Sequence, residues 1–378
     1  MNKKKQTLKE TYLQAYESYK KGDFKNTEII CYKILSIDPY HFDSTSLLAT
    51  VAAVSRNFEK AKELILKALD IQPKNKSALN NLGTIYKELG SFDEAINTFK
   101  KVLEIDSNHT NAHYNLGIVY YNLKELTNAK KYLKKTVEIQ ENYAAAFFAL
   151  GNVHVDFREY NSAISSFQKA IAINPNLVGA YNNLGLVFRI LNDFENAIKY
   201  HTKTIEIKPD HAGAHHNLGQ SYKEMGDFDN SIKYHQLAIK YEPNNLMHYH
   251  FLAELQKDIL DDNLKLKIKE IILKKEITEN NLAYGNFLLS KYDRKNKKYE
   301  EELVHLIKAH KHFFETRKNK FDLGVKYCFE DVLKISESIN VEKKANNEYN
   351  KIKPIFIIGV PRCGSTLVEK IIGSGSDL

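Results

Sequence analysis

The chain has 378 residues, a length that suits two or three domains, and 43% of them are hydrophobic, which excludes a wholly disordered protein. Its formal charge is +8 at pH 7, but residues 264–320 alone hold 15 Lys and Arg against 8 Asp and Glu. The rest of the chain is therefore nearly neutral. This distribution excludes a phosphate-tracking groove for nucleic acid along the larger part of the chain.

Cysteine usage and hydropathy indicate the compartment. Three scattered cysteines, Cys31, Cys328 and Cys363, are too few for a disulfide framework or a zinc site. No apolar stretch has the length of a signal-peptide core or of a membrane span. We therefore expect a cytoplasmic protein in a reducing compartment, with no membrane partner and no metal.

A period of 34 residues runs through the first two thirds of the chain. Leu-Gly pairs recur on this period, and a small residue (Ala, or Ser231 in the last unit) follows each glycine after twelve residues. The glycines are Gly83, Gly117, Gly151, Gly185 and Gly219. Prolines close many of the units, at Pro39, Pro73, Pro175, Pro209 and Pro243. This pattern is the signature of the tetratricopeptide repeat, in which two helices approach closely at small residues and proline stops the second helix.

The frame extends to about seven units, so we assign residues 1–245 to an α-α superhelix. Ala15 and Ala49 stand at the glycine position of the first two units. Such an array has no catalytic chemistry of its own, and its concave face is expected to bind an extended protein or peptide. His201 and His235 occupy a repeat position that Phe99 and Phe167 fill elsewhere, so we expect them to pack and not to bind metal.

A row of asparagines precedes the Leu-Gly pairs. Its members are Asn81, Asn115, Asn183 and Asn217, and Ala149 interrupts the row. A carboxamide both donates and accepts hydrogen bonds, so such a row can hold a peptide backbone whatever its side chains. The arrangement resembles the asparagine ladder of O-linked N-acetylglucosamine transferase. The alternative is that asparagine is simply common at this position in an Asn-rich chain.

Residues 246–350 are expected to form a helical connector. The glycine period is lost there, but helical periodicity continues over residues 264–275, 282–291 and 299–317. The basic residues of this region face either an acidic ligand or solvent. A polar linker leads from them into the last segment.

Residues 351–378 contain the motif that carries chemistry. Ile355 to Ile358 form a β-branched and aromatic run that predicts a short strand, followed by a loop and by a helix from Ser365 onward. A strand, a tight loop and a helix start hold phosphate well, because the loop amides point at one spot. Gly359, Gly364 and Ser365 fit a Walker A pattern that lacks its lysine, so Arg362 is the cation left to meet a phosphate or sulfate.

The residues PRCGSTLVE resemble the 5′-phosphosulfate-binding loop of sulfotransferases, above all that of bacterial relatives of protein-tyrosine sulfotransferases which carry tetratricopeptide repeats. The resemblance implies that the loop lines the sulfate end of 3′-phosphoadenosine 5′-phosphosulfate. The residues concerned are Arg362, Cys363, Gly364, Ser365, Thr366 and Leu367. Cys363 and Ser365 depart from the usual Ser and Thr.

We therefore expect a mainly α protein whose repeats are followed by the first β-loop-α of an α/β sulfotransferase domain. The resemblance implies transfer of a sulfuryl group from 3′-phosphoadenosine 5′-phosphosulfate to a hydroxyl, plausibly a protein tyrosine, with Arg362 on the leaving side. Only one strand and one helix precede Leu378, so we expect the domain to be truncated, its catalytic base to lie beyond the chain, and this chain to be inactive. The alternatives are a non-catalytic repeat scaffold and a P-loop kinase without its lysine.

Overall fold

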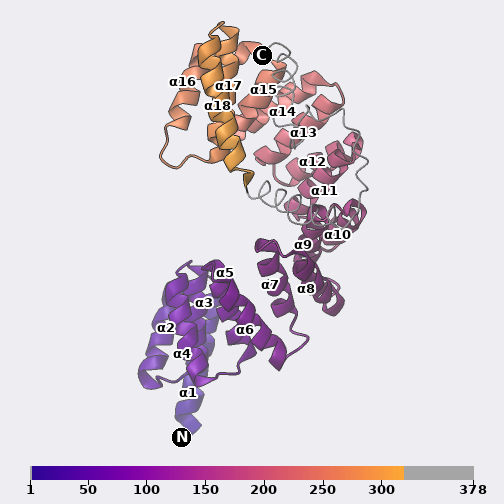
Figure 1. Ribbon diagram of the computed structural model, residues 1–378. Coiled ribbons are helices and arrows are strands. Elements are labelled where there is room, and N and C mark those ends of the chain that lie inside the picture. Colours follow the sequence, from indigo (N-terminus) through magenta and orange to yellow (C-terminus); the bar gives the residue numbers. More distant parts are fainter. Residues whose placement is uncertain (1, 319–378) are drawn as a thin grey trace, which may run out of the picture. The chain divides into compact units, whose positions relative to one another are not determined.

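The computed structural model describes residues 2–318 of the chain, with side chains from residue 6 onward (Figure 1). Over that range the chain forms α-helices and one short 3-10 helix, and no β-strand. The mainly α prediction is confirmed. The predicted strand at 355–358 and the helix after it lie outside the described residues.

The helices follow one another in pairs of nearly constant length. The bounds of the first fourteen are α1 Asn2–Lys20, α2 Phe24–Ile37, α3 Phe42–Val54, α4 Phe58–Ile71, α5 Lys76–Glu88, α6 Phe92–Ile105, α7 Thr110–Asn122, α8 Leu126–Ile139, α9 Ala144–Asp156, α10 Tyr160–Ile173, α11 Val178–Ile190, α12 Phe194–Ile207, α13 Ala212–Glu224 and α14 Phe228–Tyr241. Each odd-numbered helix packs against the even-numbered helix that follows, and each pair packs against the next (Figure 1). The predicted helical repeat architecture is confirmed.

Polar side chains fix where these helices begin. At the even-numbered helices, Asp23, Asn57, Asp193 and Asp227 each accept a hydrogen bond from the backbone N–H three residues later. At the odd-numbered helices Asn75 does the same, and His41, His109 and His211 accept through Nδ1. Each Asp or Asn cap stabilises a helix by about 0.5 to 2 kcal/mol. Three of the histidines of the chain are thus explained by helix capping.

The turn inside each pair contains one residue with positive φ, again every 34 residues. These residues are Gly22, Arg56, Gly90, Lys124, Arg158, Asn192 and Gly226. The left-handed conformation costs a residue with a Cβ roughly 1 kcal/mol, so glycine or asparagine is the usual choice. Arg56, Lys124 and Arg158 are cations at the end of the first helix, where the negative end of the helix dipole offsets part of this strain.

The two helices of a pair touch at the glycine of the repeat. A Cβ added to Gly83 would lie 2.6 Å from the ring of Phe99, and one added to Gly185 would lie 2.7 Å from the ring of His201. The residue sixteen positions after the glycine fills this place in every unit with a glycine: Phe99, Leu133, Phe167, His201 and His235, all with 0% of their surface exposed. The prediction that His201 and His235 pack like phenylalanine agrees with this geometry.

Helices α15 (Leu246–Leu255), α16 (Asp262–Ile272), α17 (Glu279–Lys295) and α18 (Tyr299–Glu315) follow the array, with the 3-10 helix Lys257–Ile259 after α15. Helix α15 packs on α14, and α17 packs on α15 around a core that includes Leu246, Ile268 and Leu288. Leu252 and Ala253 lie 34 residues after Leu218 and Gly219, so α15 continues the repeat frame. No helix in residues 2–318 is long and apolar enough to cross a lipid bilayer.

Replacing Gly185 by valine tests the contact between the paired helices. The new side chain would overlap the His201 ring, so we expect the free energy of unfolding to fall by about 1 to 3 kcal/mol, as for other overpacked cores. Denaturant unfolding followed by circular dichroism measures the change. Ser165→Val, at an exposed position of α10, is the control and should shift stability by less than about 0.5 kcal/mol. Equal stability of the two variants would show that the repeat frame is wrong.

Candidate functional site

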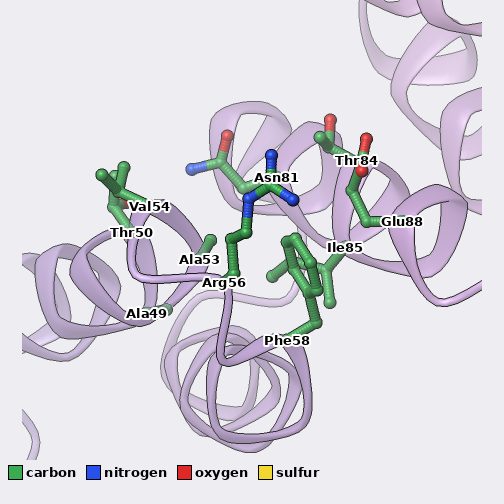
Figure 2. Close-up of a pocket in the computed structure, with 10 residues that line it drawn as sticks. All are labelled: Ala49, Thr50, Ala53, Val54, Arg56, Phe58, Asn81, Thr84, Ile85 and Glu88. Atoms are coloured by element: carbon green, nitrogen blue, oxygen red, sulfur yellow. The ribbon is translucent and has the colours of Figure 1, made fainter. Parts of the chain in front are cut away.

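A pocket of about 420 Å³ lies between α3, α4 and α5 (Figure 2). Its apolar wall consists of Ala49, Ala53, Val54, Phe58 and Ile85, and its polar lining of Thr50, Arg56, Asn81, Thr84 and Glu88. A pocket with an apolar wall and a few polar groups at one side suits a single apolar side chain that is attached to a polar backbone.

Arg56 and Asn81 supply the polar groups of this pocket from different helices. Arg56 occupies the turn between α3 and α4 at a φ of 59°, and its side chain extends toward the side of the pocket where Asn81 lies (Figure 2). Within the described residues neither side chain has a hydrogen bond or an ion pair. Both side chains are therefore available to a ligand.

All four asparagines of the predicted row lie on odd-numbered helices and are half-buried: Asn81 on α5, Asn115 on α7, Asn183 on α11 and Asn217 on α13. The carboxamides of Asn115, Asn183 and Asn217 each bond to a residue of the preceding unit. Asn183 Nδ2 donates to Asn152 Oδ1 at 2.8 Å, and Asn115 Nδ2 lies 3.5 Å from Thr84 Oγ1. We call the surface of α3, α5, α7, α9, α11 and α13 that carries these residues the ladder face.

The last asparagine of the row bonds differently. Asn217 Nδ2 donates to Asn182 Oδ1 at 3.1 Å, and Asn182 Nδ2 lies 3.3 Å from Asn183 Oδ1. The residue that would match Asn152 in this unit is Leu186, which cannot accept a hydrogen bond. The carboxamide of Asn217 therefore bonds to Asn182 in place of position 186.

Two of these contacts join a residue with the one 31 positions earlier, and the sequence contains a signal for them. The pairs are Asn115 with Thr84 and Asn183 with Asn152, and where Ala149 interrupts the row its counterpart is the apolar Ile118. In these two pairs polar residues stand opposite each other and at Ala149 two apolar ones do, whereas Asn217 stands opposite the apolar Leu186. Sequence reasoning identified the asparagines but missed their partners Thr84, Asn152 and Asn182.

The ladder face leads into a group of charges at α13, α15 and α17. Lys223 Nζ lies 2.7 Å and Lys291 Nζ 3.5 Å from the carboxylate of Glu254. His250 and Lys223 donate hydrogen bonds to this carboxylate and hold the pKa of Glu254 well below its ordinary value, while burial lowers the pKa of Lys291. Two lysines therefore share the single carboxylate of Glu254, so the group keeps a net positive charge.

Metal-ligating groups and the predicted donor-binding loop were the other sites considered from the sequence. Within residues 2–318 no group of three or more His, Cys, Asp or Glu is arranged to hold a metal ion. The predicted donor-binding residues Arg362, Cys363, Gly364, Ser365, Thr366 and Leu367 lie outside the described residues. Their role stays a prediction from the sequence.

Comparisons with known proteins concern the repeats. Models described as tetratricopeptide repeat match residues 64–97, 110–143 and 176–243, and one described as TPR repeat matches residues 83–124 and 159–189. A comparison with curated protein sequences finds no match.

Several solved structures resemble the chain. A crystal structure of MamA is 34% identical, has a TM-score of 0.42, and the match covers 43% of this chain and 95% of that chain. PilF of Pseudomonas aeruginosa is 19% identical with a TM-score of 0.51, over 59% of this chain and 97% of that one. A tetratricopeptide repeat protein of Parabacteroides merdae is 19% identical with a TM-score of 0.50, over 66% and 98%. The last two likenesses show a shared fold.

Alanine substitutions at Asn183 and Asn81 should separate structural from available carboxamides. Asn183→Ala removes the hydrogen bond to Asn152 and should lower the free energy of unfolding by about 0.5 to 1.5 kcal/mol. Asn81 has no hydrogen-bond partner within residues 6–318, so Asn81→Ala should leave stability nearly unchanged. Urea unfolding of both variants makes the comparison. The same loss in both would mean that Asn81 is also a structural link.

Proposed function

Because this chain belongs to the tetratricopeptide repeat family, we propose that it is a scaffold which binds an extended segment of a partner protein along the ladder face. The observation that carries the proposal is the line of half-buried carboxamides from α5 to α13 together with the pocket at its start.

The carboxamides suit a peptide backbone. In Asn115 and Asn217 the Nδ2 atom is directed to the neighbouring unit, whereas Oδ1 has no partner within the described residues. A peptide N–H can donate to these oxygens at little cost, because no internal hydrogen bond has to break. The internal bonds also hold the carboxamides in place before the ligand arrives, which lowers the entropy lost on binding.

The pocket adds side-chain preference. Its wall of Ala53, Phe58 and Ile85 can bury one apolar side chain of the partner, worth about 1.5 to 3 kcal/mol when fully buried. Arg56 at the same pocket has no carboxylate partner in the described residues, so an acidic residue beside the apolar one would gain a charge-assisted hydrogen bond. We therefore infer a partner segment with an apolar residue next to Asp or Glu.

Peptide selection followed by calorimetry tests the scaffold. Twelve-residue peptides selected from a phage-displayed random library on the immobilised chain should carry an apolar-acidic pair. Changing Asn81, Asn115, Asn183 and Asn217 together to Ala should weaken their binding at least about 30-fold, because each lost hydrogen bond contributes about 0.5 to 1.5 kcal/mol.

The control for this experiment is Lys101→Ala on the exposed face of α6, which should leave the affinity unchanged. Circular dichroism must show that the fourfold variant is folded. A folded fourfold variant that binds the selected peptides as tightly as the unaltered chain would refute the role of the ladder face.

A second function is proposed from residues 354–372 alone, whose PRCGSTLVE motif resembles the phosphosulfate loop of sulfotransferases. The protein would transfer a sulfuryl group from 3′-phosphoadenosine 5′-phosphosulfate to a hydroxyl, plausibly of a protein tyrosine that the repeats recruit. The reaction needs no metal: a base takes the hydroxyl proton as the acceptor oxygen attacks sulfur in line with the departing phosphate. As part of this proposal, we place the enzyme in the cytoplasm, which is a reducing compartment.

Within that proposal Arg362 would neutralise charge on the leaving side, and the N–H groups around Gly364, Ser365 and Thr366 would hold the sulfate end. No residue of this chain is assigned as the base. The absence of a Walker A lysine makes ATP a poor ligand for the same loop.

Calorimetry with 3′-phosphoadenosine 5′-phosphosulfate tests this second function on the protein produced from the complete reading frame. Arg362→Ala should weaken donor binding by about 1.5 to 3 kcal/mol, because a charge-assisted contact is lost. ATP serves as the control nucleotide and should bind far more weakly. If the protein did not bind the donor, or if Arg362→Ala did not weaken donor binding, the sulfotransferase proposal would be refuted. Only the scaffold function would then remain.

A further inference from the structure

Four histidines are buried together where α12, α13, α14 and α15 meet. Their exposed fractions are 0% for His201, 8% for His216, 0% for His235 and 1% for His248. The ring of His216 lies 5.2 Å from those of His235 and His248, and 5.0 Å from that of Phe251. We call these four residues the histidine layer.

The histidine layer has little hydrogen bonding. His201 and His235 have no partner at either ring nitrogen among the described residues, and His216 and His248 have none at Nδ1. The contact of His248 Nε2 with Glu242 Oε2, at 3.2 Å, links the layer to a half-exposed carboxylate. The rings therefore pack as neutral aromatic groups, and a proton added to any of them would be a charge buried among apolar neighbours.

The charges around the layer do not favour protonation. Arg189 of α11 faces both His201 and His216, and His211 before α13 faces His201. His235 faces Lys223 of α13 as well as Glu254 of α15, but that carboxylate is already paired with Lys223, Lys291 and His250. Glu242 lies beside His248, with half of its side chain exposed to solvent, and Arg189 lies 3.9 Å from the carboxylate of Glu224.

We propose that the histidine layer is an acid-sensitive joint, which opens the stack at α12–α15 below about pH 6 while the units from α3 to α6 stay closed. The units differ in acid sensitivity because they differ at one repeat position, the one sixteen residues after the glycine. Phe99 and Phe167 fill it in α6 and α10, Leu133 fills it in α8, and only α12 and α14 have titratable residues there among the units with glycine at the contact. In a repeat array each unit contacts its neighbours alone, so units can open separately.

The direction of the effect follows from burial. Burial lowers the pKa of His201 to about 3 and that of His235 to about 4, and it lowers the pKa values of His216 and His248 as well. An exposed histidine in the opened state titrates near about 6.5. Between these values the open state binds more protons, so the stability of the joint is complete above about pH 6.5 and is lost as the pH falls toward 4.

Hydrogen exchange read by mass spectrometry tests the joint on the intact chain, at pH 7 and at pH 5 with the intrinsic exchange rates corrected. The opening equilibrium of α12–α15 should rise roughly 20-fold for each histidine of the layer that becomes protonated on opening. Peptides from α5 and α6 should not show this change. An equal response along the whole array, or none in α12–α15, would overturn the proposal.

Exchanging residues between equivalent positions provides the matched variants. The double variant His201→Phe, His235→Phe has at these positions the residue found in α6 and α10. Its opening equilibrium should rise less between pH 7 and pH 5, by about two of the 20-fold factors, because only His216 and His248 can still respond. Phe99→His should bring acid sensitivity to α5 and α6. If the double variant does not fold, Phe99→His still decides: an unchanged pH response of α5 and α6 in a folded Phe99→His variant would refute the mechanism.

Discussion

The contact on which the array depends from α5 to α14 is the one between the glycine of an odd-numbered helix and the buried side chain that covers it from the next helix. A Cβ at Gly83, Gly151 or Gly219 would come within 3 Å of that side chain, so the two helices of a pair can approach only because glycine is there. The approach brings leucines such as Leu116 and Leu184 fully out of water. The repeat length then follows, because the same contact must recur after two helices and two turns.

Periodic contacts of this kind are what a single sequence reveals best. The glycines, the small residues after them and the prolines all fall on the 34-residue period, so the helical repeats could be predicted without any structure. The turns could not. Arg56, Lys124 and Arg158 have positive φ, a conformation that argues for glycine, and their own residue types predict ordinary helix or loop. Only the glycines at the equivalent positions in other units indicate the left-handed turn.

The ladder face was predicted in part for a related reason. The asparagine row is visible along the chain, but its partners belong to the preceding unit, and a pairing 31 residues away competes with many others of similar spacing. Thr84 and Asn152 look unremarkable until Asn115 and Asn183 lie against them. Hydrogen bonds between units therefore depend on the stacking geometry, which the period implies only in outline. The residues of the phosphosulfate-like loop lie outside the described residues, so their predicted role in donor binding is based on the sequence alone.

Uniform repeats also explain why exceptions matter. Since the glycine contact requires only a flat or branched side chain of suitable size, Phe, Leu and His all satisfy it, and packing alone does not choose among them. Histidine differs from phenylalanine at this position chiefly by two ring nitrogens that lack protein partners, a cost that a purely structural residue avoids. The cost occurs twice, at His201 and His235, beside two further buried histidines. Buried ring nitrogens without hydrogen-bond partners are therefore concentrated in the units of α12 and α14. This is the physical reason to consider that stretch of the array as distinct from the units before it.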